Sequence, residues 1–137
     1  MTVQQELEAI RRSHRGVLNP RDVVEYAKDR KTALHSRFTW DNDAAAAEYR
    51  LWQAREIIRV VVRHEEHIEK NVRVYVSLRA DRAKGGGYRA LVDVLGNEAR
   101  RQQLLAEAFD DFERWEAKYD MLAELAPIFE AAKTARK

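Results

Sequence analysis

The sequence predicts an α+β fold that is mostly helical, and three observations lead to this prediction. Apolar residues recur at helical spacing in three segments of the N-terminal half. One later stretch alternates strictly between apolar and polar residues, which is typical of a half-buried strand. The C-terminal segment repeats apolar residues every seven positions. We therefore expect a three-helix N-terminal body, a small antiparallel β-hairpin and a long C-terminal helix.

Apolar spacing indicates the first helix, and a capping signal indicates the second. A helix over residues 2–12 is expected because apolar residues there recur at i, i+4 and i+7. Asn19 and Pro20 predict the start of the second helix, since an asparagine N-cap followed by proline in the first helical position is typical of a helix N-terminus. This second helix is expected to run to about Asp29.

A polar connection over residues 30–43 separates the second and third helices. Its isolated apolar residues Leu34, Phe38 and Trp40 predict an ordered segment that is anchored to the core, with one helical turn. Of these three, Trp40 is the one we expect to be a core residue.

The third helix is expected to begin at Ala44, with Asp41 as a candidate cap. Residues at steps of three and four form one apolar stripe along it. Its end is open, because residues 57–62 are rich in β-branched side chains that also favour a strand. Tyr49 and Trp52 are either core residues or an exposed platform.

Residues 72–79 predict a strand with Tyr75 and two arginines on its polar face. A return strand is expected over residues 88–95, although a short helix that ends at Gly96 fits the same residues. Of these two alternatives we favour the strand, which completes a hairpin.

The predicted hairpin carries the basic segment RADRAKGGGYR, which holds three of the five glycines in the chain. A Walker phosphate loop requires lysine and a hydroxyl residue after its last glycine, whereas Lys84 precedes these glycines. The dinucleotide motif GxGxxG is also absent. The loop resembles the wing of a winged-helix protein, whose hairpin tip contacts the phosphate backbone. The candidate nucleic-acid-binding residues are Arg73, Tyr75, Arg79, Arg82, Lys84 and Arg89.

Arginines also occur on the predicted third helix, at Arg50, Arg55 and Arg59. They fit phosphate geometry, but acidic residues accompany them, so surface ion pairs are the alternative. A glycine-rich turn with arginines is likewise often only a solvated turn.

We expect one domain that consists of a body (residues 1–96) and a C-terminal helical segment (residues 97–137) that packs on the body or on a partner. Pro127 is expected to kink or divide this segment. Its apolar seam either packs inside the domain or forms a coiled-coil dimer. The candidate self-association residues are Leu105, Phe112, Trp115, Tyr119 and Leu122.

Composition excludes several classes of site. The chain has no cysteine, so disulfides, thiolate metal ligands and thiol nucleophiles are excluded. His64 and His67 have the spacing HEEH rather than HExxH, and we interpret them as part of a charged bend. No metal, cofactor or catalytic residue is predicted.

The N-terminus resembles neither a secretory signal nor a transit peptide, and no long apolar run occurs, so we expect a cytoplasmic protein without membrane contact.

One block of the sequence, LH..F.WD..AA..YR..QAR, resembles small proteins of unassigned activity that are encoded by bacteriophages and prophages. The resemblance covers about a third of the chain and implies a phage origin, but it supplies no activity and no site residues. The matching residues are Leu34, His35, Phe38, Trp40, Asp41, Ala45, Ala46, Tyr49, Arg50, Gln53, Ala54 and Arg55.

The hypothesis that follows is a non-enzymatic phage or prophage accessory protein that binds nucleic acid through a basic wing-like loop, as a dimer. The alternative is a protein-interaction or assembly factor, acting in phage morphogenesis or blocking a host partner, that uses the aromatic C-terminal helix. An enzyme is the third alternative. The sequence does not distinguish DNA from RNA.

Overall fold

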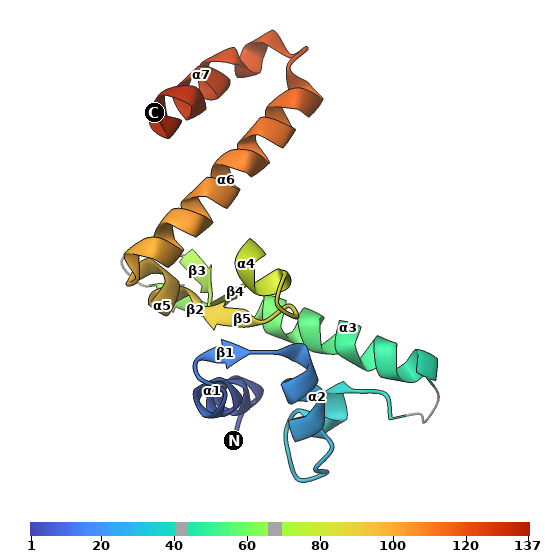
Figure 1. Ribbon diagram of the computed structural model, residues 1–137. Coiled ribbons are helices and arrows are strands. Elements are labelled where there is room, and N and C mark those ends of the chain that lie inside the picture. Colours follow the sequence, from blue (N-terminus) through green and yellow to red (C-terminus); the bar gives the residue numbers. More distant parts are fainter. Residues whose placement is uncertain (41–43, 66–69) are drawn as a thin grey trace. The chain divides into compact units, whose positions relative to one another are not determined.

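The computed structural model describes residues 1–40, 44–65 and 70–137, and the chain divides into two compact units (Figure 1). Unit 1 is Met1–Val94 and unit 2 is Leu95–Lys137. The fold is α+β and mostly helical, which confirms the predicted fold class. The helices that the structure describes include none that is both long and apolar enough to cross a membrane.

Among its described residues, unit 1 contains the three predicted helices, two small sheets and three short helices, of which η1 is a 3-10 helix. In chain order these elements are α1 (Val3–Ser13), β1 (Val17–Leu18), α2 (Pro20–Ala27), η1 (His35–Arg37), α3 (Ala44–Val60), β2 (Val62–Glu65), β3 (Lys70–Arg73), β4 (Tyr75–Val76), α4 (Arg79–Arg82), β5 (Tyr88–Ala90) and α5 (Leu91–Leu95).

Side-chain caps begin the first two helices, and the cap of the second was predicted. At α1, the Thr2 hydroxyl accepts the N–H of Gln5 while the Gln5 side chain accepts the N–H of Thr2, which forms a capping box. At α2, the Asn19 side chain accepts the N–H of Arg21 at 3.0 Å, and Pro20 is the first helical residue. Local hydrogen bonding therefore determines where both helices start, and the sequence predicted this start signal for α2.

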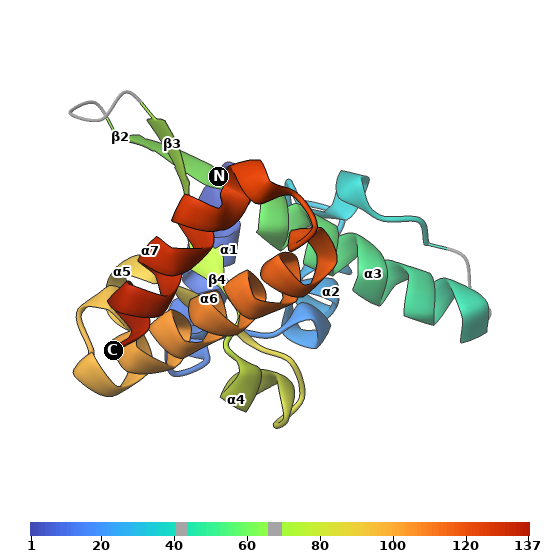
Figure 2. The same cartoon turned by 90° about the horizontal axis from the view of Figure 1, so that it is seen from above.

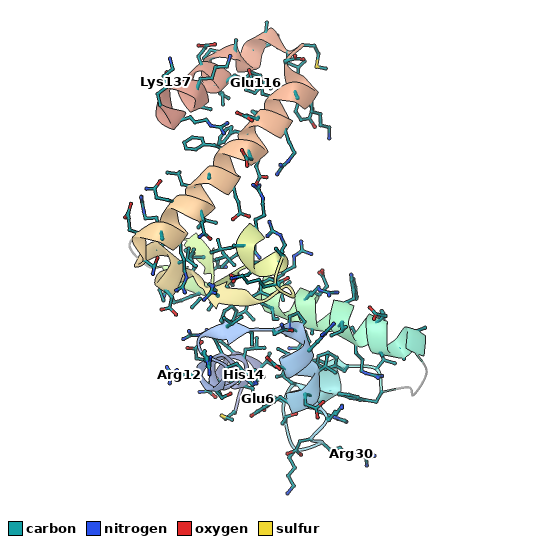
Figure 3. All side chains as sticks on the ribbon, viewed as in Figure 1. Glu6, Arg12, His14, Arg30, Glu116 and Lys137 are labelled. Atoms are coloured by element: carbon teal, nitrogen blue, oxygen red, sulfur yellow. The ribbon has the colours of Figure 1, made fainter. Side chains whose placement is uncertain are left out.

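The connection after α2 is ordered by a buried carboxylate. Glu6 on α1 is only 3% exposed, and its oxygens accept the N–H groups of Ala33 and Leu34 at 2.8 and 2.9 Å (Figure 3). Leu34 and Phe38 are buried, which confirms two of the predicted anchors. The candidate cap Asp41 lies outside the described residues.

Trp40, the third predicted anchor, is partly buried. Its ring stacks on His35 with centroids 4.9 Å apart, and its indole N–H donates to the carbonyl of His35 at 2.8 Å. Trp40 therefore closes the connection over η1 at the edge of the core.

The β-branched segment 57–62 remains helical as far as Val60, and a strand then begins at Val62, so only the end of the segment follows the predicted alternative of a strand. β2 pairs antiparallel with β3, with Val62 opposite Arg73 and His64 opposite Asn71, and the hairpin extends away from the helices of unit 1 (Figure 2). The charged bend was predicted at His64 and His67: His64 instead lies in β2, and His67 lies outside the described residues.

The second sheet of unit 1 has the strand order β1-β5-β4, and both pairings are antiparallel. Val17 pairs with Arg89 on one side of β5, and Val76 pairs with Arg89 on its other side. The pairing of β4 with β5 confirms a hairpin between the two predicted strand segments. The strand β1 was not predicted, because two residues are too few to show alternation.

Residues 72–79 are not one strand, and the prediction was wrong on this point. Val74 separates β3 from β4: its N–H donates to the carbonyl of Val61, and its carbonyl accepts the N–H of Leu91. The chain therefore passes from one sheet to the other at Val74. Tyr75, predicted on the polar face, is fully buried.

The loop and the return strand also differ from their predictions. The first part of the expected basic loop is the short helix α4, and a turn that contains the glycines follows it. Residues 88–95 form both of the structures that the sequence left open. They begin as β5 and continue as α5.

The core of unit 1 lies between α1, α2, α3 and the β1-β5-β4 sheet (Figure 1). It is contributed by residues from every one of these elements, and Tyr75 is among its largest fully buried side chains. The buried apolar residues of this cluster are Leu7, Ile10, Leu18, Val23, Ala27, Leu34, Phe38, Ala54, Ile58, Tyr75 and Tyr88.

Unit 2 is a helical hairpin of α6 (Glu98–Tyr119), the 3-10 helix η3 (Ala123–Leu125) and α7 (Ala126–Arg136) (Figure 2). Asn97 caps α6 by accepting the N–H of Arg100, which confirms the predicted start of the long helix. The chain turns near residue 120, whereas Pro127 lies in the first turn of α7, where proline needs no hydrogen-bond partner. The break thus precedes the proline that was expected to produce it.

Candidate nucleic-acid interface

A shallow basic pocket of about 550 Å³ opens on unit 1 beside the glycine turn. Half of the described residues that line it are arginines, and none of these residues is acidic, although acids nearly balance bases in the whole chain. The lining residues are Arg55, Arg59, Arg73, Ser77, Arg82, Gly85, Gly86 and Tyr88.

Three elements supply the four arginines of this pocket. Arg55 and Arg59 are four residues apart on α3, so the helical repeat places them on the same face. Arg73 is the last residue of β3, and Arg82 is the last residue of α4. The arginine cluster is therefore a product of the tertiary fold, since these residues are separated by up to 27 positions in the sequence.

The glycine turn forms the remaining wall. Gly85 and Gly86 have positive φ values of 110° and 85°, a region that residues with a Cβ rarely adopt. The turn is fixed by the N–H of Gly86, which donates to the carbonyl of Asp81 at 3.0 Å. The absence of side chains at both positions leaves the backbone open to a ligand in the pocket.

The four arginines of the pocket differ in how many hydrogen bonds and ion pairs their guanidinium groups form within the protein. Arg59 pairs with Glu56 at 2.8 Å on the exposed surface, and Arg82 donates to the carbonyl of Ser77 at 2.8 Å. Arg55 and Arg73 have no carboxylate partner among the described residues. Guanidinium groups suit phosphate because their planar donors match its oxygens in pairs, so the pocket can bind a phosphate group.

The structure brings two of the predicted nucleic-acid residues into this pocket, Arg73 and Arg82. Lys84 is exposed and directly precedes Gly85, so it lies at the rim. Arg79 is exposed at the start of α4 but does not line the pocket.

Arg89 does not face a ligand, which corrects the prediction for this residue. Its guanidinium donates two hydrogen bonds to Asp81, at 2.7 and 2.9 Å, and both side chains are more than four-fifths buried. A bidentate, largely buried pair has its donors already satisfied. Arg89 therefore joins β5 to α4 and acts as a structural residue.

Tyr75 is likewise removed from the candidate set, because it is 0% exposed. Its hydroxyl donates to Glu8 at 3.1 Å, and Glu8 also accepts from Arg11. Burial is the largest cause that raises the pKa of Tyr75, and the nearby charge of Glu8 adds to it. A tyrosine ring can be buried when its hydroxyl has a hydrogen-bond partner. The alternating pattern placed Tyr75 on the polar face because it treats tyrosine as a polar residue.

The sequence pointed to Arg55 and Arg59 only as part of a basic helix face, and they were not among the candidates. Glu56 lies between them, so the pattern resembles an ordinary surface ion pair. They are four residues apart, and the apolar residues lie on the opposite face of the helix. This spacing is the signal that could have identified them as candidate nucleic-acid-binding residues.

The predicted self-association residues lie on unit 2 and are partly covered within it. The ring of Trp115 contacts Phe129 of α7 with centroids 5.3 Å apart, so part of the seam forms the interior of the helical hairpin. Leu105, Phe112 and Leu122 are 40 to 44% exposed, and Tyr119 is partly buried. The heptad pattern therefore serves the hairpin and also leaves an apolar surface.

That apolar surface includes a groove of about 620 Å³ on unit 2. Phe112, Trp115 and Ile128 contribute its apolar walls, together with Ala108, and Asp111 is the one charged lining residue. Within the described ranges, no three His, Asp or Glu side chains lie close enough to hold one metal ion.

Comparison of the chain with protein-family models, with curated proteins and with solved structures finds no match. The chemistry of the basic pocket and of the apolar groove therefore has to be inferred from their residues and geometry.

Proposed function

We propose that this protein is a non-enzymatic nucleic-acid-binding protein that contacts the phosphate backbone through the basic pocket of unit 1. The observation that carries the proposal is the convergence of Arg55, Arg59, Arg73 and Arg82 on a pocket whose described lining residues include no acid. Phosphate contacts by arginine supply most of the affinity of sequence-independent nucleic-acid binding.

The arrangement of unit 1 supports this proposal. Its order of helix, strand, two helices and a closing pair of strands, with the sheet order β1-β5-β4, is typical of winged-helix proteins, with the β2–β3 hairpin as an addition. In that arrangement the third helix and the segment between the last two strands contact nucleic acid. Here these elements are α3 and the α4–glycine segment, which are the main contributors to the pocket.

The test is a titration of labelled oligonucleotides, followed by fluorescence anisotropy over a range of salt concentrations. The variant Arg55→Gln/Arg73→Gln removes two charges that have no carboxylate partner among the described residues, so the fold should remain intact. We expect the slope of log K against log salt to become shallower by about 1.4 to 1.8, since each phosphate contact contributes about 0.7 to 0.9.

The matched control is Arg30→Gln/Lys31→Gln, which removes the same charge from the exposed turn after α2 (Figure 3). It should change the slope much less, because neither residue lines the pocket. Absence of binding at low salt, or equal losses in both double variants, would show that the pocket is not a phosphate site.

We also propose that the apolar groove of unit 2 is covered by a second copy of the chain. A two-fold interface presents the same patch to itself, so the border of the patch needs both signs of charge. The groove of Phe112, Trp115 and Ile128 has both signs beside it, because its lining residue Asp111 forms an ion pair with Arg114.

On the basis of the sequence resemblance, we further propose that the protein acts as a phage or prophage accessory protein.

A further inference from the structure

An exposed pair of aromatic rings lies on α3, outside the basic pocket. Tyr49 and Trp52 are 48% and 52% exposed, their ring centroids are 5.6 Å apart, and their planes differ by only 16°. Single exposed aromatic residues are common on protein surfaces. Here two large rings stack on each other in parallel, and about half of each side chain remains exposed, so the pair presents preorganised aromatic surface to solvent.

The aromatic pair and the arginines share one helix. Trp52 precedes Arg55 by three residues and Arg59 by seven, so the helical repeat places all three along one face of α3. The rise from Trp52 to Arg59 is about 10 Å. A ligand that lies along this face therefore meets aromatic rings first and guanidinium groups next.

The surroundings of the pair keep it available. The nearby Arg50 is directed to the other side, because its guanidinium lies 5.5 Å from the Trp40 ring and donates to the carbonyl of Thr39. The apolar residues of α3 that are fully buried, Ala54 and Ile58, face the core. Tyr49 and Trp52 thus contribute little to the core of unit 1.

We infer that Tyr49 and Trp52 form a stacking platform for unpaired bases, so that the ligand of this surface is single-stranded nucleic acid. Bases in a duplex already stack on their neighbours, whereas an unpaired base can place its face on an aromatic ring. The platform takes the bases and the arginine pocket takes the phosphates of the same strand. This inference rests on the proposed function, whose basic pocket supplies the charge.

The test compares a single-stranded oligo(dT), an oligo(U) of the same length and a duplex, with the full-length protein. Trp52→Ala should lower the affinity for both single strands by about 5- to 150-fold, which corresponds to the loss of one base–aromatic stack. Its affinity for the duplex and its salt slope should not change, because all the arginines remain. Trp52→Phe retains an aromatic face and should recover most of the affinity.

The outcomes distinguish the two proposals. Salt-dependent binding that is equally strong for Trp52→Ala and the original protein overturns the platform and leaves the basic pocket in place. A duplex that binds more tightly than either single strand also overturns the platform. Absence of binding by any of the probes at low salt overturns both. Thermal melting should be the same for the three proteins, since the ring is half exposed.

Discussion

The carboxylate of Glu8 connects α1 to two distant parts of unit 1. It accepts hydrogen bonds from Arg11 and from the buried Tyr75, each at 3.1 Å, and Arg11 also bonds Asp93 of α5 at 2.8 Å. The hydrogen bond from Arg11 is the largest cause that lowers the pKa of Glu8 below its usual value, although partial burial opposes it. The four side chains form one continuous polar network beside the core.

The first prediction concerns the pH dependence of this network. Because the pKa of Glu8 is lowered in the folded state, its charge stabilises the fold above the usual pKa of 4.5. This stabilisation is lost as the pH falls through the folded-state pKa. Glu8→Gln should lower the free energy of unfolding by about 1.5 to 3 kcal/mol at neutral pH and by less in acid. Urea unfolding over this pH range measures the difference.

Glu25→Gln is the control for this experiment, because Glu25 pairs with Lys28 on the exposed surface of α2. Its effect should stay within about 0.5 kcal/mol at every pH. If the two variants lost equal stability, or if the loss in Glu8→Gln did not depend on pH, the network would have no special role.

The second prediction concerns the close approach of the glycine turn to β1. A Cβ at Gly87 would lie 2.3 Å from Cγ1 of Val17, so Gly87→Ala forces one of them to move. We expect a loss of about 1 to 3 kcal/mol, the usual cost of overpacking. Val17→Ala removes the opposing methyl, and in the double variant part of the loss should be recovered. Strict additivity of the two losses would contradict this contact.

At the scale of elements, the third prediction separates the structural arginine from the ligand-binding ones. Arg89 holds β5 to α4 through Asp81 in a pair that is largely buried. Arg89→Gln should therefore cost about 1.5 to 3 kcal/mol in unfolding free energy, as expected for hydrogen bonds between charged groups. Below its melting transition, the variant should keep the salt slope of oligonucleotide binding. A shallower slope with unchanged stability would restore Arg89 to the interface.

The elements that could be predicted from the sequence are those specified by local chemistry. Asn19 and Asn97 determine helix starts through hydrogen bonds within three residues, and the structure has the helices where these caps place them. The strand tendency of the residues after α3 was also visible in their β-branched side chains.

The elements that could not be predicted depend on contacts that are distant in sequence. The pairing of Val17 with Arg89 joins residues 72 positions apart, and neither β1 nor the burial of Tyr75 has a local signal. The candidate site likewise combines residues with a local sequence signal and residues that only the fold brings together. The basic character of the segment around Arg82 was evident, whereas only the fold brings Arg55 beside it.

At the scale of the whole molecule, the charge divides between the two units. Unit 1 carries 18 Lys and Arg against 14 Asp and Glu, whereas unit 2 carries 7 against 9. A basic unit 1 agrees with phosphate binding there, and an acidic unit 2 would be repelled by the same ligand. Unit 2 is therefore better suited to contact protein, which is consistent with self-association through its apolar groove.

The last prediction is that the purified protein forms a dimer through this groove. The residue for the test must lie in the groove without supporting the hairpin. Trp115 is unsuitable because it packs on Phe129. Ile128 lines the groove and is 46% exposed, so Ile128→Asp should leave unit 2 folded. A charge buried in an apolar interface is strongly unfavourable, so the variant should sediment as a monomer at concentrations where the original protein is a dimer.

The control is Met121→Asp, which adds the same charge at a site that is 71% exposed and outside the groove, so this variant should remain a dimer. If the original protein itself sediments as a monomer at micromolar concentrations, the groove does not bind a second copy.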